Sequence, residues 1–167
     1  MKNLLLVILL FFVTAHSNSE SLCLPSEKTY FSCATKKNKF ISVCGSPKIK
    51  SNQRSYIQYR YGTFDNIELE YPKDRKGSLN SFSFTHYFRS QYDLTELEFV
   101  NSDYQYSIFW IYDGESKQDR KVDSGIRIKK VGTQKKFKIS CSSQIIMNLA
   151  DLEDLVPCNK SNPLAFC

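Results

Sequence analysis

Two pairs of glutamates are the strongest candidates for acid–base chemistry in the sequence. Glu68 and Glu70 lie two residues apart, and so do Glu96 and Glu98. On an extended strand, residues two apart share one face and lie about 6.5–7 Å apart, which is near the carboxylate separation of inverting glycosidases. The same pattern is typical of a solvent-exposed strand face, and this simpler interpretation outweighs catalysis.

The sequence offers little for nucleophilic catalysis or metal binding. His86 is the only histidine after residue 17, and it shares its strand face with Phe82, Phe84 and Phe88, which favours a core or rim position over a general base. No G-x-S-x-G motif surrounds a serine. There is no C-x-x-C pair for zinc, and Asp113-Gly114-Glu115 lacks the repeated ligands of a calcium loop. We therefore assign no catalytic residue, no metal ligand and no cofactor, and favour a binding protein over an enzyme.

The six cysteines predict disulfides. All of them follow residue 17, and an even number is typical of an exported, disulfide-bonded chain. We expect the last two to pair, because they bracket a short polar tail. The other four should connect the amino-terminal segment to later strands, with Cys141 closing the longest loop; alternatively, Cys33 and Cys44 face each other across a hairpin at residues 38–39. The six are Cys23, Cys33, Cys44, Cys141, Cys158 and Cys167.

Residues 1–17 have the pattern of a secretory signal peptide. Lys2 precedes an apolar run from Leu4 to Val13, and Ala15 and Ser17 form a small-residue cleavage motif. The apolar run is too short to cross a bilayer, which needs about 20 residues. We therefore predict an exported chain, periplasmic or secreted, with no transmembrane segment after cleavage. We expect residues 18–167 to form a single domain with a disulfide-bonded C-terminal tail.

The charge is mildly basic, with a formal net value of +6, and the lysines and arginines are scattered along the chain. This distribution is unlike a tract for phosphate backbones, so we expect no nucleic-acid partner. A protein or an anionic glycan of the cell envelope or the exterior remains open as a partner. Asn159-Lys160-Ser161 matches an N-glycosylation acceptor motif.

Alternation of apolar and polar residues with period two predicts a mainly β protein. Turn-forming residues separate the runs, so consecutive strands should pair antiparallel in a disulfide-stapled sandwich or barrel of about nine short strands. The run at 104–112 is apolar on both faces in its second half, which favours a central position. The predicted strands span residues 30–33, 40–43, 56–61, 67–71, 81–87, 94–100, 104–112, 125–131 and 135–141.

After Cys141 the pattern changes. Ile145, Ile146, Leu149 and Leu152 recur at spacings near three and four, which predicts a short C-terminal helix packed on the sheet. The strands are also rich in tyrosine, which either packs between strands or forms a recognition surface, and we favour packing. These tyrosines are Tyr56, Tyr59, Tyr61, Tyr71, Tyr87, Tyr104, Tyr106 and Tyr112.

Several segments together resemble a family of small exported bacterial proteins of uncharacterised function. They are FSC at 31–33, ISVC at 41–44, YIQYRYG at 56–62 and ELEYP at 68–72, with YQY following at 104–106. The resemblance covers roughly residues 23–141 and implies a periplasmic or secreted β domain, without supplying active-site residues. The chain departs from the family pattern in its tail, which adds two cysteines, and in lacking a glycine-rich stretch after Tyr112.

These observations favour an exported, disulfide-stabilised binding module whose ligand the sequence does not define, such as an inhibitor or recognition protein of the cell envelope. One alternative is a glycan-acting hydrolase that uses Glu68, Glu70, Glu96 or Glu98. That function needs its carboxylates to converge in a concave pocket. Another alternative is a structural envelope protein, which an extensive exposed apolar patch would favour.

Overall fold

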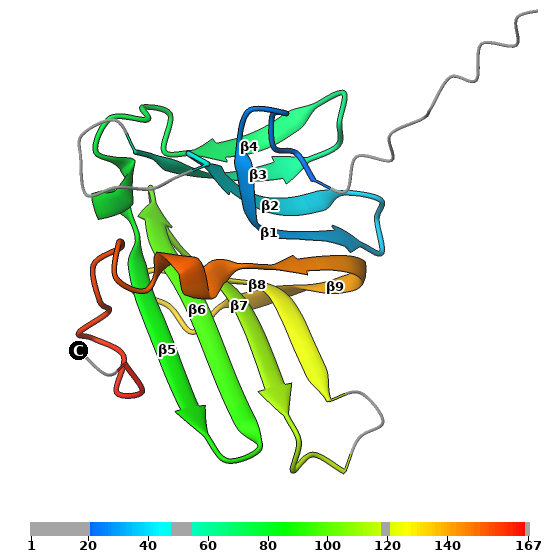
Figure 1. Cartoon of the computed structure of the whole chain (residues 1–167), viewed down its shortest axis with the longest axis vertical. Coiled ribbons are helices and arrows are strands. Elements are labelled where there is room, and N and C mark those ends of the chain that lie inside the picture. Colours follow the sequence, from blue (N-terminus) through cyan, green and yellow to red (C-terminus); the bar gives the residue numbers. More distant parts are fainter. Residues whose placement is uncertain (1–20, 48–54, 118–120, 166–167) are drawn as a thin grey trace, which may run out of the picture.

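In the part of the chain that the structure describes, nine antiparallel strands form one continuous sheet in the order β4-β3-β2-β1-β9-β8-β7-β6-β5 (Figure 1). The computed structural model describes residues 21–47, 55–117 and 121–165, so the predicted signal peptide lies outside the described residues. The prediction of a mainly β, antiparallel, disulfide-bonded fold is confirmed. The strands are β1 (Lys28–Thr35), β2 (Phe40–Gly45), β3 (Ile57–Gly62), β4 (Ile67–Tyr71), β5 (Ser83–Arg89), β6 (Tyr92–Asn101), β7 (Tyr104–Asp113), β8 (Val122–Lys130) and β9 (Lys136–Met147).

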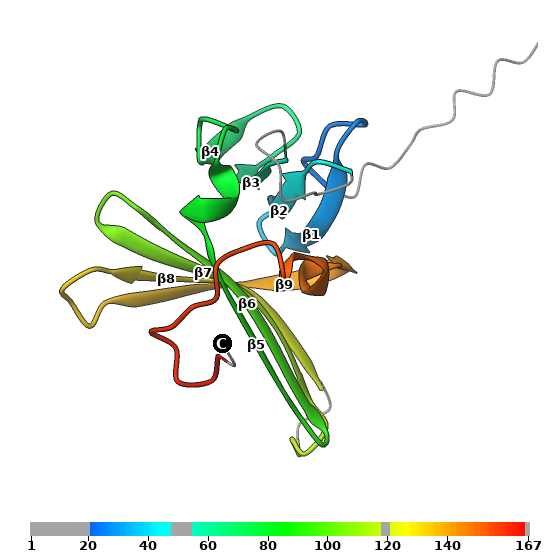
Figure 2. The same ribbon diagram turned by 60° about the vertical axis from the view of Figure 1, so that its left-hand side comes forward.

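Strand β9 joins two halves of the sheet. Its first part pairs with β8, and its second part, from Cys141 onward, pairs with β1. We call β1–β4 the first half and β5–β8 the second half. Irregularities in the β1–β9 register at Ser32/Ala34 and Ala34/Thr35 mark the junction, and such bulges bend a strand. Figures 1 and 2 show the strands of the first half crossing those of the second half steeply.

The core lies between the inner faces of the two halves. An aromatic cluster connects them, because Tyr71 of β4 stacks on Phe99 of β6 with ring centroids 4.4 Å apart. Phe99 in turn stacks on Tyr106 of β7 at 4.8 Å and contacts Tyr59 of β3 at 5.1 Å. These three tyrosines therefore pack between strands, in agreement with the interpretation that we favour from the sequence.

Within the described residues, one disulfide lies in the first half and another connects the first half to β9 at the junction. Cys23 bonds Cys44, and Cys33 bonds Cys141 across a sequence separation of 108 residues, so Cys141 closes the longer loop as predicted. The alternative pairing of Cys33 with Cys44 is wrong, because the hairpin register places Cys33 opposite Ile41. Cys158 is also in a disulfide. Its predicted partner, Cys167, lies outside the described residues.

The C-terminal helix is smaller than predicted. Ile145 and Ile146 extend β9, which gains β1 as a second partner, and only the 3-10 turn η2 (Leu149–Leu152) is helical there. A second 3-10 turn, η1 (Ser78–Ser81), precedes β5. No helix in the described ranges has the length and apolar character needed to cross a membrane.

The tail, residues 157–165, lies along the edge strand β5 (Figure 2). The backbone N–H of Phe84 donates to the carbonyl of Pro157 at 2.8 Å, and the N–H of Asn159 donates to the carbonyl of Phe84 at 2.8 Å. This short parallel bridge between Phe84 and Cys158 continues the sheet by one step. The tail thereby comes to lie beside the outer face of β6.

Candidate functional site

The outer face of β6–β9, opposite the core, gathers polar side chains from segments far apart in sequence. Directly opposed residues of an antiparallel pair share one face, so the register defines which side chains meet. Three adjacent rows cross the strands on this face. They are Val100, Gln105, Lys129 and Lys136; then Glu98, Ser107, Arg127 and Lys138; then Glu96, Phe109, Gly125 and Ser140.

A cavity of about 460 Å³, which we call the polar cavity, opens on this face. The side chains that define it include Glu96, Glu98, Gln105, Ser107, Arg127 and Lys138. A second hollow of about 460 Å³ lies on the other side of Glu98 and Gln105, beside the tail. The second of the two predicted glutamate pairs therefore lines a concave site.

The first predicted glutamate pair lies elsewhere. Glu68 and Glu70 belong to β4 at the edge of the first half. A carboxylate oxygen of Glu68 lies 2.6 Å from the Lys39 ammonium, and one of Glu70 lies 2.9 Å from the Arg60 guanidinium. The four glutamates therefore do not converge, and only Glu96 and Glu98 among them line the polar cavity.

Glu96 is a buried carboxylate in the wall of the polar cavity, with 7% of its surface exposed. One of its oxygens accepts a hydrogen bond from Arg127 at 2.5 Å, and the other accepts one from the Asn162 side chain at 3.3 Å. Burial raises the pKa of Glu96, and the nearby charge of Glu98 adds to the rise, against the opposing effects of Arg127 and Asn162. Perturbed carboxyl groups in clefts are typical of functional sites.

Glu98 connects the polar cavity to the tail. One of its oxygens accepts hydrogen bonds from the Ser107 hydroxyl and from Gln105, and the other accepts one from the Asn159 side chain. Asn159 is 7% exposed, and its own oxygen accepts a bond from the Ser161 hydroxyl at 2.7 Å. The nitrogen that would carry a sugar in the Asn159 acceptor motif is therefore bonded to Glu98 in the folded protein.

Four cations stand together on β8 and β9. Lys129 lies directly opposite Lys136, and Arg127 lies directly opposite Lys138. Arg127 is bonded to the buried glutamate, and the Lys138 ammonium lies 2.6 Å from a carboxylate oxygen of Asp123. Within the described part of the chain, Lys129 and Lys136 make no ion pair. We call these four side chains the cation block, and all four line the polar cavity.

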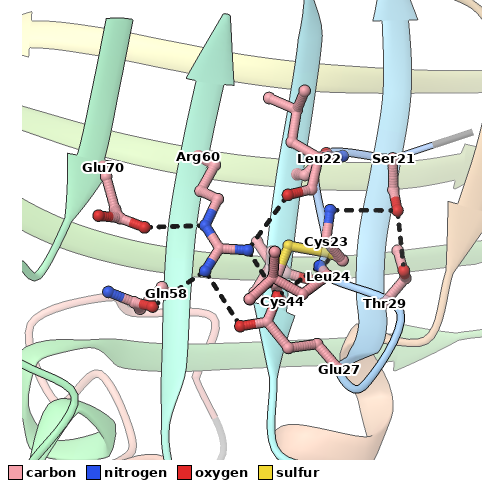
Figure 3. A network of polar contacts seen from close by, with 12 residues as sticks. Ser21, Leu22, Cys23, Leu24, Glu27, Thr29, Cys44, Gln58, Arg60 and Glu70 are labelled. Carbon is pink, nitrogen blue, oxygen red and sulfur yellow. Dashed lines mark hydrogen bonds and ion pairs between the residues drawn. A yellow bond between two sulfur atoms is a disulfide. The ribbon is translucent and has the colours of Figure 1, made fainter. Parts of the chain in front are cut away.

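A second polar cluster covers the outer face of the first half, centred on Arg60 of β3 (Figure 3). Its Nε donates to Glu70 at 2.9 Å, and Nη1 donates to Glu27 at 2.5 Å and to the backbone carbonyl of Leu22 at 3.1 Å. Nη2 donates to the other oxygen of Glu27 at 3.0 Å and to Gln58 at 3.1 Å. All five N–H groups of the guanidinium are thus used, and none is left for a ligand.

Glu27 belongs to residues 21–27, which we call the N-terminal segment. Burial would raise its pKa, but hydrogen bonds from Arg60, from the backbone N–H of Leu24 and from the Tyr56 hydroxyl outweigh burial and hold the pKa below its ordinary value. The Cys23–Cys44 disulfide lies beside this carboxylate. Oxidised cysteines offer no thiolate to a metal, so the cluster anchors the N-terminal segment to the sheet.

His86 lies at the rim of the second half. Its Nδ1 is 3.1 Å from Glu153, which follows η2, and its Nε2 is 3.1 Å from Asp93 of β6. It lines neither the polar cavity nor the hollow beside the tail. The histidine therefore connects β5 to neighbouring segments.

Comparison with known proteins adds no functional assignment. No protein-family model matches the chain, and neither a curated protein nor a solved structure does. The resemblance to exported bacterial proteins stays a prediction.

The sequence identifies Glu96 and Glu98 as candidates but misses the residues around them. Alternation alone places Arg127 and Lys129 on one face of a strand. It does not indicate that Arg127 lies opposite Lys138 of the next strand, because the sequence of one strand does not show how it is aligned with its neighbour. Asn159 carries a signal for glycosylation, which conceals its role as a partner of Glu98.

Proposed function

We propose that the chain is an exported, disulfide-stabilised binding protein that takes a polar ligand in the polar cavity. The observation that carries this proposal is the cavity of about 460 Å³ itself, which charged, amide and hydroxyl side chains from four strands line together with Ile128 and Phe137. Ligand sites are typically concavities of roughly 300–1,000 Å³ with a few well-placed polar groups. Side chains fixed on paired strands hold such groups more rigidly than loops do.

The hydrogen bonding of the two glutamates favours binding over hydrolysis. A general acid must reach the oxygen that it protonates. In the polar cavity, Arg127 and Asn162 occupy the oxygens of Glu96, while Asn159 and the β7 side chains occupy those of Glu98. The carboxylates therefore serve to fix the tail and shape the cavity wall.

The disulfides indicate the setting in which a ligand is met. Cys23–Cys44 and Cys33–Cys141 require an oxidising, non-cytoplasmic compartment to persist. With the signal-peptide pattern at residues 1–17, this supports export to the periplasm or the exterior. The ligand then belongs to the envelope or the exterior, as a protein or a glycan, and the chain acts as an inhibitor or a recognition module.

A cavity-filling variant tests the proposal. We expect Gln105→Trp to occupy the polar cavity while keeping a residue that favours strands. The control is Phe88→Trp, since Phe88 is a β5 residue that is 69% exposed and lines neither the polar cavity nor the hollow beside the tail. Each oxidised protein is immobilised and exposed to extracts of cell envelope and culture fluid.

The proposal requires one saturable component that the original protein and Phe88→Trp retain and that Gln105→Trp does not. Equal retention by Gln105→Trp would contradict the proposal, as would the absence of any saturable component. Unfolding midpoints of all three proteins show whether a loss of retention reflects misfolding.

A glycan-acting hydrolase is the second candidate, because the raised pKa of Glu96 is suited to a general acid and Glu98 lies beside it. In this function a substrate displaces the tail asparagines from the carboxylates. Turnover of a panel of soluble glycans that is abolished in Glu96→Gln would support hydrolysis. Turnover that persists unchanged in Glu96→Gln and in Glu98→Gln would exclude these residues as its source.

A further inference from the structure

We propose that the ligand of the polar cavity is a linear anionic polysaccharide, bearing carboxylate or sulfate groups, that lies across the cation block and continues to Lys36 and Lys37. This inference rests on the proposed function, because it names the ligand class for the same site. Cations line two cavities that share Lys138.

The cation block is unfavourable for the protein alone. Like charges that lie directly opposite each other across two strands destabilise the pair. Two such pairs occur in succession, Lys129 with Lys136 and Arg127 with Lys138. Glu96 offsets the charge of Arg127 and Asp123 that of Lys138, so the repulsion between Lys129 and Lys136 is the part that is not offset. An anionic ligand seated on this face would remove it.

A further cavity of about 350 Å³, which we call the lysine cavity, lies between the end of β1 and β9. Lys36 and Lys37, in the turn after β1, line it together with Lys138 and the ring of Tyr61. None of the described residues that line it is a carboxylate. Neither Lys36 nor Lys37 makes an ion pair within the residues that the structure describes, so the two ammonium groups are available to an anion.

Lys138 lines both cavities and so connects them. From Lys136 to Ser140, which lies at the lysine cavity, β9 advances by about 13 Å at the usual rise per residue. A single small anion cannot contact both ends of this path. A chain with charges repeated along its length can occupy the polar cavity and the lysine cavity together.

The chemistry between the charges favours sugar over nucleic acid. Single-stranded nucleic acid is held by successive aromatic rings that stack on the bases. Among the described residues, one ring lines each cavity, Phe137 in the polar cavity and Tyr61 in the lysine cavity, so no succession of rings follows the path. Gln105 and Ser107 lie beside the cations of the polar cavity, and Thr35 and Ser140 beside those of the lysine cavity. Amide and hydroxyl groups match the hydroxyls of a sugar chain.

Defined polymers test the inference by titration of the full oxidised protein. The probes are polygalacturonate and heparin as anionic glycans, dextran as a neutral glycan, and oligothymidylate as a nucleic acid. The variants are Lys36→Gln/Lys37→Gln and Lys129→Gln/Lys136→Gln. The control is Lys73→Gln/Lys76→Gln, which removes the same charge from an exposed loop that lines neither cavity.

We expect saturable binding of at least one anionic glycan and none of dextran. Each cavity variant should raise Kd about tenfold and flatten its dependence on salt, because fewer counterions are released. The control should leave Kd unchanged. Binding of oligothymidylate as tight as that of the glycans would overturn the inference, as would equal weakening in the control variant.

Failure of this inference is distinguishable from failure of the proposed function. One outcome is that neither anionic glycan binds, while an envelope component is retained by the original protein and lost in Gln105→Trp. In that case the proposal of an anionic polysaccharide fails, and the polar cavity is still a binding site. If that retained component is an acidic protein, the polysaccharide is likewise overturned. If Gln105→Trp retains every component and binds both glycans as the original protein does, the polar cavity is not the binding site.

Discussion

Both halves of the sheet have a polar outer face that a terminal segment covers, but the two coverings differ in completeness. On the first half, the N-terminal segment and the Cys23–Cys44 disulfide reduce the exposure of Arg60 to 4% and saturate its guanidinium. On the second half, the tail reaches Glu96 and Glu98 and leaves the cation block at the surface. One polar face is closed, and the other stays open.

The buried glutamates of the two faces show what this difference means. Glu27 receives two guanidinium partners, Arg60 and Arg75, and its pKa is lowered. Glu96 receives one, and burial together with Glu98 raises its pKa. The charges around Glu27 are arranged to stabilise the native chain. Those around Glu96 are left unbalanced, which is expected where a ligand completes the site.

Removing the Cys33–Cys141 bond should have the largest effect, because this bond lies at the junction of both halves. In the chain-entropy treatment, its 108-residue separation corresponds to about 5 kcal/mol and the 21-residue separation of Cys23–Cys44 to about 3 kcal/mol. We expect these losses of unfolding free energy in Cys33→Ala/Cys141→Ala and Cys23→Ala/Cys44→Ala, measured by urea denaturation. A larger loss of unfolding free energy in Cys23→Ala/Cys44→Ala than in Cys33→Ala/Cys141→Ala would contradict the expectation that the bond at the junction stabilises the fold more.

Glu27→Gln should break the closed face. It leaves Arg60 buried without its main countercharge, and loss of one partner from a buried pair costs about 3–5 kcal/mol. Urea denaturation at neutral pH measures the loss, with Glu68→Gln as a control, since Glu68 pairs with Lys39 at the exposed sheet edge. A loss below about 1 kcal/mol, the usual range of a surface pair, would show that the face is not a closed network.

Glu96→Gln should leave stability almost unchanged and so sharpen the contrast. The side chain of Arg127 is 42% exposed and can be solvated when its partner becomes neutral. The substitution also removes a buried charge and its repulsion with Glu98. We expect a change within about 1 kcal/mol. A loss as large as that in Glu27→Gln would mean that the open face is as structural as the closed one.

The two glutamates should also give the stability profile opposite slopes with pH. The pKa of Glu96 is raised above 4.5, so the native state binds more protons between 4.5 and the raised value, and acidification through that window stabilises the fold. The pKa of Glu27 is lowered below 4.5, so its stabilisation is present above 4.5 and is lost as the pH falls through the lowered value. Thermal midpoints against pH should lose the first trend in Glu96→Gln and the second in Glu27→Gln. If both variants kept the pH dependence of the original protein, the two trends would not come from Glu96 and Glu27.

Much of the fold is readable from the sequence, because alternation survives wherever one face of a strand is buried. The strand at 67–71 is predicted with the bounds that the structure has. The prediction fails at β9, where Ile145 and Ile146 imitate helical spacing. This strand changes partner and contains bulges at the β1 junction, so its alternation is interrupted just where the sequence pattern would be needed.

Less of the candidate site is readable. The shared face of Glu96 and Glu98 follows from their spacing. Their partners do not, because Arg127 reaches Glu96 through the register of three strands, and Asn159 reaches Glu98 through the path of the tail. The closed face around Arg60 is equally hidden, since its countercharge Glu27 is 33 residues away in sequence.

The position of β9 between β1 and β8 has a consequence for how the chain acquires its structure. β1 pairs with β2 and β8 pairs with β7, but the other edge of each of these two strands has no partner until β9 is present. Pairings between distant segments slow folding, because the intervening chain must be ordered first. Completion of the sheet therefore waits until β9, at residues 136–147, has been synthesised. A chain with this topology stays incompletely folded until then, which suits the export that we propose.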